Sequence, residues 1–277
     1  MQNPDTIHLI HYLHARLQPV LDEYPDRRAK FNGSSILLQV GERFFFISAA
    51  HVFAAPADGG VLHVVGDSRN LRLRLNDVVG GTDASSPNPG EGTIDVAFLE
   101  VTAADVERLG GAAALQMNEV DVDESLRPKG AYLAIGYPGS KTSIDQRKGI
   151  VRVKPFAFHT GRAEPEIYRT FGHSPNTHLV LKYDRDSVTW HDEVERKGPL
   201  PHGMSGGGVW CVRNTAPASP GPADAKLVAI MIQYHAKDQV IVATRIALLL
   251  EGIRVRFPEL SPLIPRTAAI KLNVGRG

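Results

Sequence analysis

Near the start of the chain, apolar side chains recur every three or four residues. They are Ile10, Leu13, Leu17, Val20, Leu21 and Tyr24. This spacing predicts an amphipathic helix over residues 5–25. His8, His11 and His14 lie in the same stretch, three residues apart. Because a helix has about 3.6 residues per turn, these side chains fan out, which favours a solvated helix edge over a metal site.

From residue 33 onward the pattern changes to short apolar segments separated by Gly, Pro and Asp, which is typical of strands. We predict strands at residues 35–40, 43–48, 61–66, 71–75, 95–101, 131–136, 149–154, 177–183, 208–212, 227–234 and 239–243. Gly41-Glu42, between the first two, predicts a tight hairpin. Many short strands of this kind predict an all-β sandwich or barrel.

The remaining segments predict connections and one more helix. Residues 76–92 and 214–222 are rich in small, polar and turn-forming residues, and we expect surface loops there. The strand rhythm is interrupted over residues 103–130, which favours a crossover between two halves. A closing helix is predicted over residues 244–254, ending before Pro258.

The composition limits the classes of partner. The 277 residues carry a formal charge of +1, which gives no reason to expect nucleic acid or an anionic membrane surface as a partner. No apolar run reaches the roughly 18 residues that a membrane span needs. Cys211 is the single cysteine, so no intrachain disulfide can form, and the first residues lack a basic signal-peptide region. We therefore expect a cytoplasmic protein.

Three short motifs carry candidate chemistry. They are Ser48-Ala49-Ala50-His51, Thr93-Ile94-Asp95-Val96-Ala97 and Gly203-Met204-Ser205-Gly206-Gly207. Together they supply an imidazole base, a carboxylate and a hydroxyl nucleophile, the three groups that serine-dependent acyl transfer requires. Asp95 lies in an apolar segment, where a carboxylate is costly unless it is paired, and we expect His51 to be its partner.

With these motifs in the order His, Asp, Ser, the chain resembles a trypsin-like (chymotrypsin-fold) serine peptidase over roughly residues 30–255. The resemblance implies an all-β fold of two packed six-stranded antiparallel β-barrels, with the N-terminal helix and the closing helix added. It divides the chain into the helical segment 1–27, a first barrel 28–120 and a second barrel with the closing helix, 121–277. It implies no cofactor and no metal.

The resemblance also assigns roles. Ser205 becomes the nucleophile, His51 the general base and then acid, and Asp95 the residue that orients His51. The amides of Gly203 and Ser205 become the oxyanion hole.

The substrate-binding residues implied by the resemblance are Pro199, His202, Ile232, Gln233, Tyr234 and Ile241. Pro199 falls at the floor of the primary pocket, and Tyr234 and Ile241 fall on its walls, where small glycines stand in trypsin-type pockets. An uncharged, partly filled pocket predicts cleavage of protein or peptide substrates after small or aliphatic residues.

Departures from the family pattern leave an alternative. Met204 stands where secreted digestive members have an aspartate, and no Ile-Val-Gly-Gly start is present. Ile232 replaces a serine that supports the triad aspartate in those enzymes. The alternative is a pseudopeptidase, inactive through the Ile232 and Tyr234 changes and used as a protein-binding module. The complete triad favours the enzyme, for which a regulatory protein partner is also possible.

Other patterns in the sequence are weaker evidence for a functional site. The run around Ser205 also fits the G-x-S-x-G elbow of α/β-hydrolases, but residues 195–202 are no buried strand, and too little chain follows for the rest of such a sheet. Acidic and histidine side chains cluster over residues 184–195, which favours a solvated loop over a cation site. Cys211 is expected to be a small core residue.

Overall fold

The computed structural model describes residues 4–26, 28–56, 59–66, 69–82, 94–110, 112–124, 131–148, 150–190, 194–212 and 221–267. The helices are α1 (Pro4–His14), α2 (Ala103–Leu109), α3 (Pro165–Thr170) and α4 (Ile246–Arg256). The strands of the first half are β1 (Leu17–Glu23), β2 (Ala29–Val40), β3 (Arg43–Ser48), β4 (Val61–Val64), β5 (Leu71–Arg72), β6 (Val78–Thr82), β7 (Asp95–Val101) and β8 (Leu115–Gln116). Those of the second half are β9 (Ala131–Gly136), β10 (Thr142–Asp145), β11 (Ile150–Val153), β12 (Phe156–Thr160), β13 (His178–Lys182), β14 (Val188–Trp190), β15 (Glu195–Arg196), β16 (Gly208–Val212), β17 (Ala225–His235) and β18 (Val240–Arg245).

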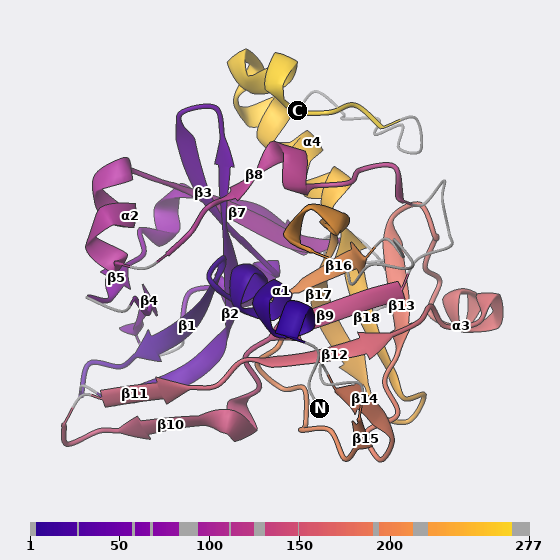
Figure 1. The fold of residues 1–277 in the computed structure, drawn as a ribbon. Helices are drawn as coiled ribbons and strands as arrows, with labels where there is room; N and C mark the ends of the chain where they lie inside the picture. The colour runs from indigo at the N-terminus through magenta and orange to yellow at the C-terminus, as the bar shows by residue number, and fades with distance from the viewer. Residues whose placement is uncertain are drawn as a thin grey trace.

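Two curled sheets make up the two halves of the molecule (Figure 1). The first has the strand order β5-β4-β1-β2-β3-β7-β6, with β8 added in parallel on β2, and the second has the order β13-β18-β17-β16-β9-β12-β14-β15. The predicted all-β architecture of two barrel-like halves is confirmed. Each of these two sheets contains eight strands rather than six, because the short strands β5, β14 and β15 extend the edges and β8 adds to β2.

Every strand predicted from the sequence overlaps an observed strand. The hairpin at Gly41 is present, with Val40 paired to Arg43 and Gly41 at a φ of 60°. The strands that the sequence pattern did not reveal are β1, β6, β8, β10, β12, β14 and β15. Most of these are short or lie at sheet edges, where few positions are buried and the alternation of apolar and polar residues is weak.

The predicted helix over residues 5–25 is wrong in its second half. The helix α1 ends at His14, and residues 17–23 form β1, which pairs with β2 on one side and β4 on the other. Pro19 explains the difference, since it disfavours helical geometry at Gln18 and its ring cannot continue a helix. A register shift after Val20 accommodates the proline inside the sheet.

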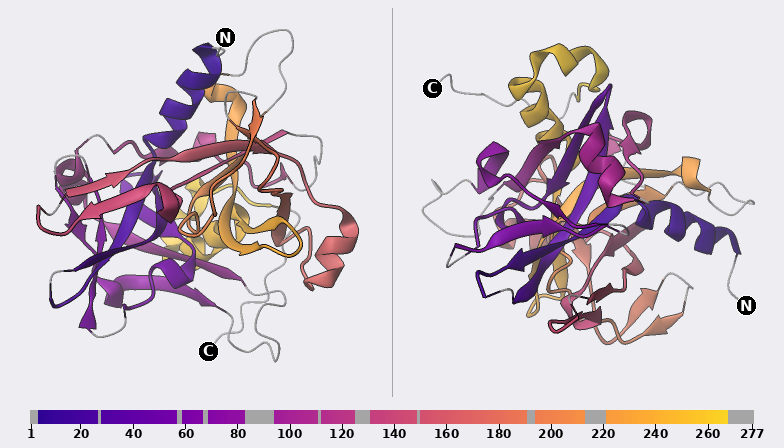
Figure 2. Two further views of the ribbon diagram at one scale, coloured as in Figure 1. Left: turned by 90° about the horizontal axis from the view of Figure 1, so that it is seen from below. Right: turned by 90° about the vertical axis from the view of Figure 1, so that its left-hand side faces the viewer.

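The helix α1 is fixed to both halves of the fold. Leu9 and Leu13 are buried in the main core. At its end, His14 Nε2 lies 2.7 Å from the Tyr137 hydroxyl, so this histidine does not lie on a solvated edge, whereas His8 and His11 are exposed. The N-terminal end of α1 projects from the strands in both views of Figure 2.

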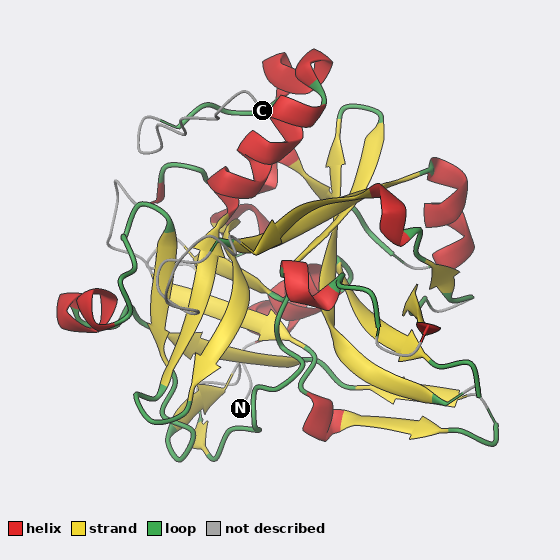
Figure 3. Cartoon of the chain, turned by 180° about the vertical axis from the view of Figure 1, so that it is seen from behind, coloured by secondary structure: helices red, strands yellow, loops and turns green. Residues whose placement is uncertain are grey.

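The closing helix is confirmed as α4, which directly follows β18. It packs against β17 of the second sheet and β7 of the first. In this region the ring centroids of Phe98 and Phe257 lie 6.4 Å apart. Helices lie around the strands rather than between them (Figure 3). The structure contains, among its described helices, none long and apolar enough to span a membrane.

The predicted connections are partly outside the described residues. Residues 83–93 and 213–220 fall in the two predicted loops and are not described, while residues 78–82 form β6. Over the predicted crossover, α2 is followed by β8 and then by a bridge from Val120 to Leu227 of the second sheet. The proposed division between the halves at residue 120 stays a prediction.

Candidate active site

His51 stands on a short helical turn directly after β3. The small residues Ala49 and Ala50 are buried and let this turn pack closely, while the His51 side chain is 46% exposed. The turn therefore presents the imidazole to solvent at the end of a rigid strand.

Asp95 is the first residue of β7 and is 8% exposed. One carboxylate oxygen lies 2.6 Å from His51 Nδ1, and the other accepts a hydrogen bond from the His51 backbone N–H at 3.1 Å. A carboxylate can only accept, so Nδ1 carries the proton and the lone pair is on Nε2. An imidazole oriented in this way can take a proton at Nε2. The predicted pairing of these two residues is present.

Ser205 lies on a sharp turn between the two halves. Gly203 and Gly206 have φ angles of +90° and +82°, a region that side chains rarely adopt. A side chain at Gly206 would also collide with the Ser34 carbonyl, and one at Gly203 with the Phe31 ring. The glycines on either side of Ser205 are therefore required by backbone geometry and by the close approach of β2.

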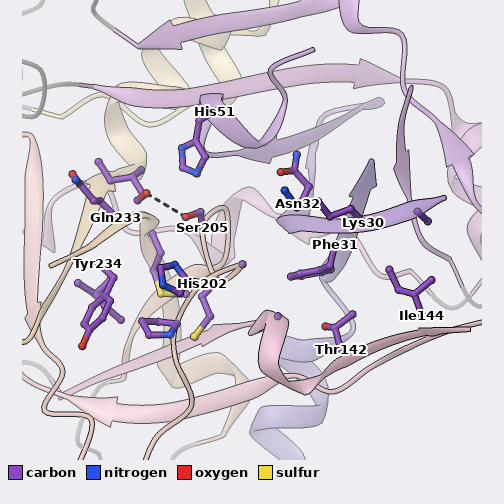
Figure 4. A pocket seen from close by; sticks show the side chains of 18 residues that line it. Lys30, Phe31, Asn32, His51, Thr142, Ile144, His202, Ser205, Gln233 and Tyr234 are labelled. Carbon is purple, nitrogen blue, oxygen red and sulfur yellow. Dashed lines mark hydrogen bonds between the residues drawn. The ribbon is translucent and has the colours of Figure 1, made fainter. Parts of the chain in front are cut away.

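The Ser205 hydroxyl donates a hydrogen bond to the Ile232 carbonyl at 3.2 Å (Figure 4). In the described part of the chain, no hydrogen bond joins it to His51, although both side chains line the same cavity. A rotation about the Cα–Cβ bond of Ser205 would be needed to transfer its proton to His51. The sequence contained no signal for this bond, because its acceptor is a backbone carbonyl.

The backbone amides of Gly203 and Ser205 have no hydrogen-bond acceptor among the described residues. The carbonyls around them are all occupied. His202 O accepts from Gly139 N at 2.7 Å and Met204 O from Gly207 N at 2.9 Å. Because a trans peptide points its C=O and N–H in opposite directions, fixing these two carbonyls aims both amides away from them. Two such free donors can stabilise a negatively charged oxygen.

A cavity of about 760 Å³ lies over these groups. Of the predicted site residues, it is lined by His51, His202, Gly203, Ser205, Ile232, Gln233, Tyr234 and Ile241. Further lining residues that the sequence pattern did not indicate come from the start of β2 and from the antiparallel pair β10–β11: Lys30, Phe31, Asn32, Thr142 and Ile144. No Asp or Glu lines the cavity among the described residues.

Comparison with known proteins adds to this geometry. No protein-family model and no curated protein sequence matches the chain. Among solved structures, it is similar to mouse neuropsin, a serine protease (TM-score 0.52, 11% identity, 92% of this chain and 97% of that one). It is also similar to a variant of the HtrA-type protease AlgW with a tripeptide (TM-score 0.50, 14% identity, 91% of this chain). The chain spans 64% of the length of AlgW.

The chain has the two-barrel fold of trypsin-like serine proteases. Within that fold His51 and Asp95 come from the first sheet and Ser205 from the loop before β16 of the second. The fold thus brings together three residues that are far apart in the sequence, and does so at the cavity between the halves.

Pro199 is the exception among the predicted substrate-binding residues. It does not line the cavity, and its carbonyl accepts a hydrogen bond from the buried Tyr183 hydroxyl at 2.6 Å. Tyr183 also meets the Tyr234 ring edge to face, with ring centroids 5.6 Å apart. The aromatic pair therefore lies beside the cavity in the region where the sequence analysis had expected Pro199 to form a floor.

Other candidate sites from the sequence analysis do not gain support. No group of three or more His, Cys, Asp or Glu residues that could hold a metal ion occurs in the described ranges. Residues 191–193 of the acidic segment lie outside those ranges. Cys211, on β16, is partly buried and packs against the hydrophobic core of the second half.

Proposed function

We propose that this chain is a serine endopeptidase that cleaves protein or peptide substrates through an acyl-enzyme intermediate. One observation carries the proposal: the His51–Asp95 pair, the Ser205 hydroxyl and the free amides of Gly203 and Ser205 meet at one cavity. Base, nucleophile and oxyanion donors are the parts that this chemistry requires. The fold likeness to serine proteases supports the same reaction class.

In the first step, Ser205 Oγ adds to the carbonyl carbon of the substrate and its proton passes to His51 Nε2. The electron pair of the carbonyl moves to oxygen, which receives hydrogen bonds from the Gly203 and Ser205 amides. When the tetrahedral intermediate collapses, the C–N bond breaks and His51 gives its proton to the departing amine. Water then repeats the sequence on the acyl-enzyme, releasing the acid and restoring Ser205.

Reaction with a fluorophosphonate tests the nucleophile. We expect one covalent adduct on the peptide that contains Ser205, no adduct in Ser205→Ala, and a severely slowed reaction in His51→Ala, because an unassisted hydroxyl is a poor nucleophile. Ser187→Ala is a matched control, since Ser187 lies outside the cavity and its hydroxyl bonds Glu195. A folded wild-type chain that does not react would contradict the proposal.

For specificity, we propose cleavage after small or aliphatic residues. Tyr234 and Ile241 line the cavity and occupy volume that a large side chain would need, and no described carboxylate lines it to pair with Lys or Arg. We also propose a cytoplasmic location on the basis of the single cysteine, which cell fractionation would test.

A second candidate is a binding module that does not cleave its protein partner. The hydrogen bond from Ser205 to the Ile232 carbonyl favours it, because this bond directs the hydroxyl away from His51. The same bond is also compatible with a peptidase in which a regulatory partner turns Ser205 toward His51. Fluorophosphonate reaction without any partner contradicts the binding module. Absence of that reaction is expected both for the binding module and for a peptidase that requires its partner, and only the second should react once the partner is added.

A further inference from the structure

The turn that carries Ser205 is fixed by a residue from the opposite half, Ser34 of β2. Its backbone N–H donates to the Ser205 carbonyl at 2.8 Å, and its hydroxyl donates to the Gly203 carbonyl at 3.0 Å. The Gly203 carbonyl belongs to the peptide unit that lies between the two free amides of the turn. One residue thus fixes the backbone on both sides of Met204.

The hydroxyl of Ser34 is itself oriented by its surroundings. Ser34 is fully buried, and its Oγ accepts a hydrogen bond from the Tyr137 backbone N–H at 3.0 Å. Its carbonyl accepts from the Ser48 hydroxyl at 2.7 Å, which fixes the strand. With the Oγ lone pair engaged by Tyr137, the single hydroxyl proton is directed to Gly203.

The hydroxyl restrains a glycine of the turn. Gly203 has no side chain, and its φ of +90° is open to few other residues. If the Ser34 hydroxyl is lost, its hydrogen bonds to the Gly203 carbonyl and from the Tyr137 N–H are both lost. The Gly203–Met204 peptide is then held only at its N–H, which donates to the Pro201 carbonyl at 2.9 Å. A tilt of this peptide shifts the two neighbouring amides.

We propose that Ser34 is a positioning residue that keeps the Gly203 and Ser205 amides aimed at the oxyanion through its hydroxyl. This inference rests on the proposed serine peptidase function. Ser34 does not touch the substrate, since it does not line the cavity, and it acts through the backbone of the turn.

The neighbouring residue Ser35 provides a matched control. It is equally buried, and its hydroxyl also donates to a backbone carbonyl, that of Gln18 in β1, at 3.2 Å. Ser34→Ala and Ser35→Ala therefore remove the same atoms at the same depth in the same strand. Only the first removes a hydrogen bond to the turn, the one to the Gly203 carbonyl.

The test is adduct formation with a peptidyl trifluoromethyl ketone carrying ¹³C at the carbonyl. Ser205 Oγ adds to this carbon, the proton passes to His51, and the carbonyl oxygen becomes an oxyanion in the hole. We expect Ser34→Ala to lower kcat about 100-fold with little change in KM, as a small misplacement of a catalytic group does. The pKa of the adduct oxygen, measured by NMR titration, should rise by up to about two units, because a 100-fold loss of oxyanion stabilisation corresponds to two pKa units. Ser35→Ala should change neither.

Each result has a distinct meaning. An oxygen pKa in Ser34→Ala equal to that of wild type and Ser35→Ala would overturn the positioning role while leaving the peptidase intact. A wild-type chain that forms no adduct would overturn the proposed function and the positioning role with it. If Ser34→Ala does not fold, Ser34→Cys keeps a donor at the same position, with a slightly larger atom and a weaker hydrogen bond. An intermediate pKa rise in Ser34→Cys supports the proposal, and an unchanged pKa overturns it.

Discussion

Asp95 contacts His51 twice, at the ring and at the backbone. Oδ2 lies 2.6 Å from the ring Nδ1, and Oδ1 accepts from the backbone N–H at 3.1 Å. The two contacts fix the position of the residue as well as the tautomer of its ring. Ile232 has no hydroxyl to donate to this carboxylate, and the His51 backbone N–H supplies a hydrogen bond to its Oδ1.

Replacing Asp95 with Asn should abolish most of the activity. The Asn amide can donate a hydrogen bond to Nδ1, which places the ring proton on Nε2. Nε2 then cannot accept the proton of Ser205. We expect kcat to fall about 10⁴-fold with a much smaller change in KM. The measurement is steady-state hydrolysis of a peptide substrate, with the rate of fluorophosphonate reaction as a second readout.

Asp22→Asn is the control for this variant. Asp22 is a buried carboxylate on β1 whose Oδ1 has no hydrogen-bond partner, and burial raises its pKa. A raised folded-state pKa makes the ionised form unfavourable, so stability falls as the pH rises above the ordinary value of 3.8. Asp22→Asn should therefore keep activity and raise the melting temperature at neutral pH. Equal activity loss in both variants would contradict a specific role of Asp95 in orienting His51.

How far the sequence predicts this structure depends on the kind of signal. Short apolar segments between turn residues locate the central strands, and the motifs around His51, Asp95 and Ser205 predict the groups that meet at the cavity. The strand β1 was missed because Leu17, Val20 and Leu21 fit helical spacing as well as a fully buried strand. Pro19 was the available signal against the helix.

The parts of the site that could not be predicted are those made by backbone contacts. Neither the Ser205–Ile232 bond nor the Ser34 contacts leave a pattern in the sequence, because any residue can supply a carbonyl. The position of Pro199 outside the cavity could not be predicted for a related reason: counting back from Ser205 does not reveal that the Tyr183 hydroxyl binds the Pro199 carbonyl.

Deleting residues 1–14 should destabilise the protein without increasing its activity. The helix α1 buries Leu9 and Leu13, and Arg16 beyond it pairs with Glu119 at 3.0 Å, yet no described α1 residue lines the cavity. Loss of two buried leucines costs on the order of 4–10 kcal/mol by analogy with large-to-small substitutions. Thermal unfolding and peptide hydrolysis measure the two effects.

Two further observations would decide the role of α1. A deletion extended to residue 25 removes β1, which is paired on both sides, and should prevent folding altogether. A gain of activity in the shorter deletion would instead identify α1 as an inhibitory segment.

His173 should make the protein sensitive to acid. It stacks on His178 with ring centroids 4.1 Å apart, and both of its ring nitrogens are buried without a partner. Burial, assisted by His235, lowers its pKa from 6.5 to about 4. The unfolded chain therefore binds a proton that the folded one does not, and stability is lost as the pH falls from 6.5 toward 4, with a slope of at most about 1.4 kcal/mol per pH unit.

Urea unfolding at a series of pH values across this window measures the slope. His173→Phe keeps a planar ring in the stack but cannot take a proton, so its slope should be shallower. His11→Phe, at an exposed position of α1, should leave the slope unchanged. Identical slopes in His173→Phe and wild type would assign the acid sensitivity to His178, His235 or other groups.

The specificity of cleavage tests how the substrate side chain is received. Tyr234 and Ile241 line the cavity, Tyr183 packs against Tyr234, and no carboxylate lines it among the described residues. A peptide library should show cleavage after Ala, Val or Leu, with Arg and Lys disfavoured by about 100-fold or more, because their charge would be desolvated without a partner.

Tyr234→Ala should extend the preference to larger apolar side chains, since it opens the wall of the cavity. Pro199→Ala should leave the profile unchanged, because Pro199 does not line the cavity. A dominant preference for Arg or Lys would contradict the proposed pocket, and a profile altered by Pro199→Ala would restore Pro199 to its floor.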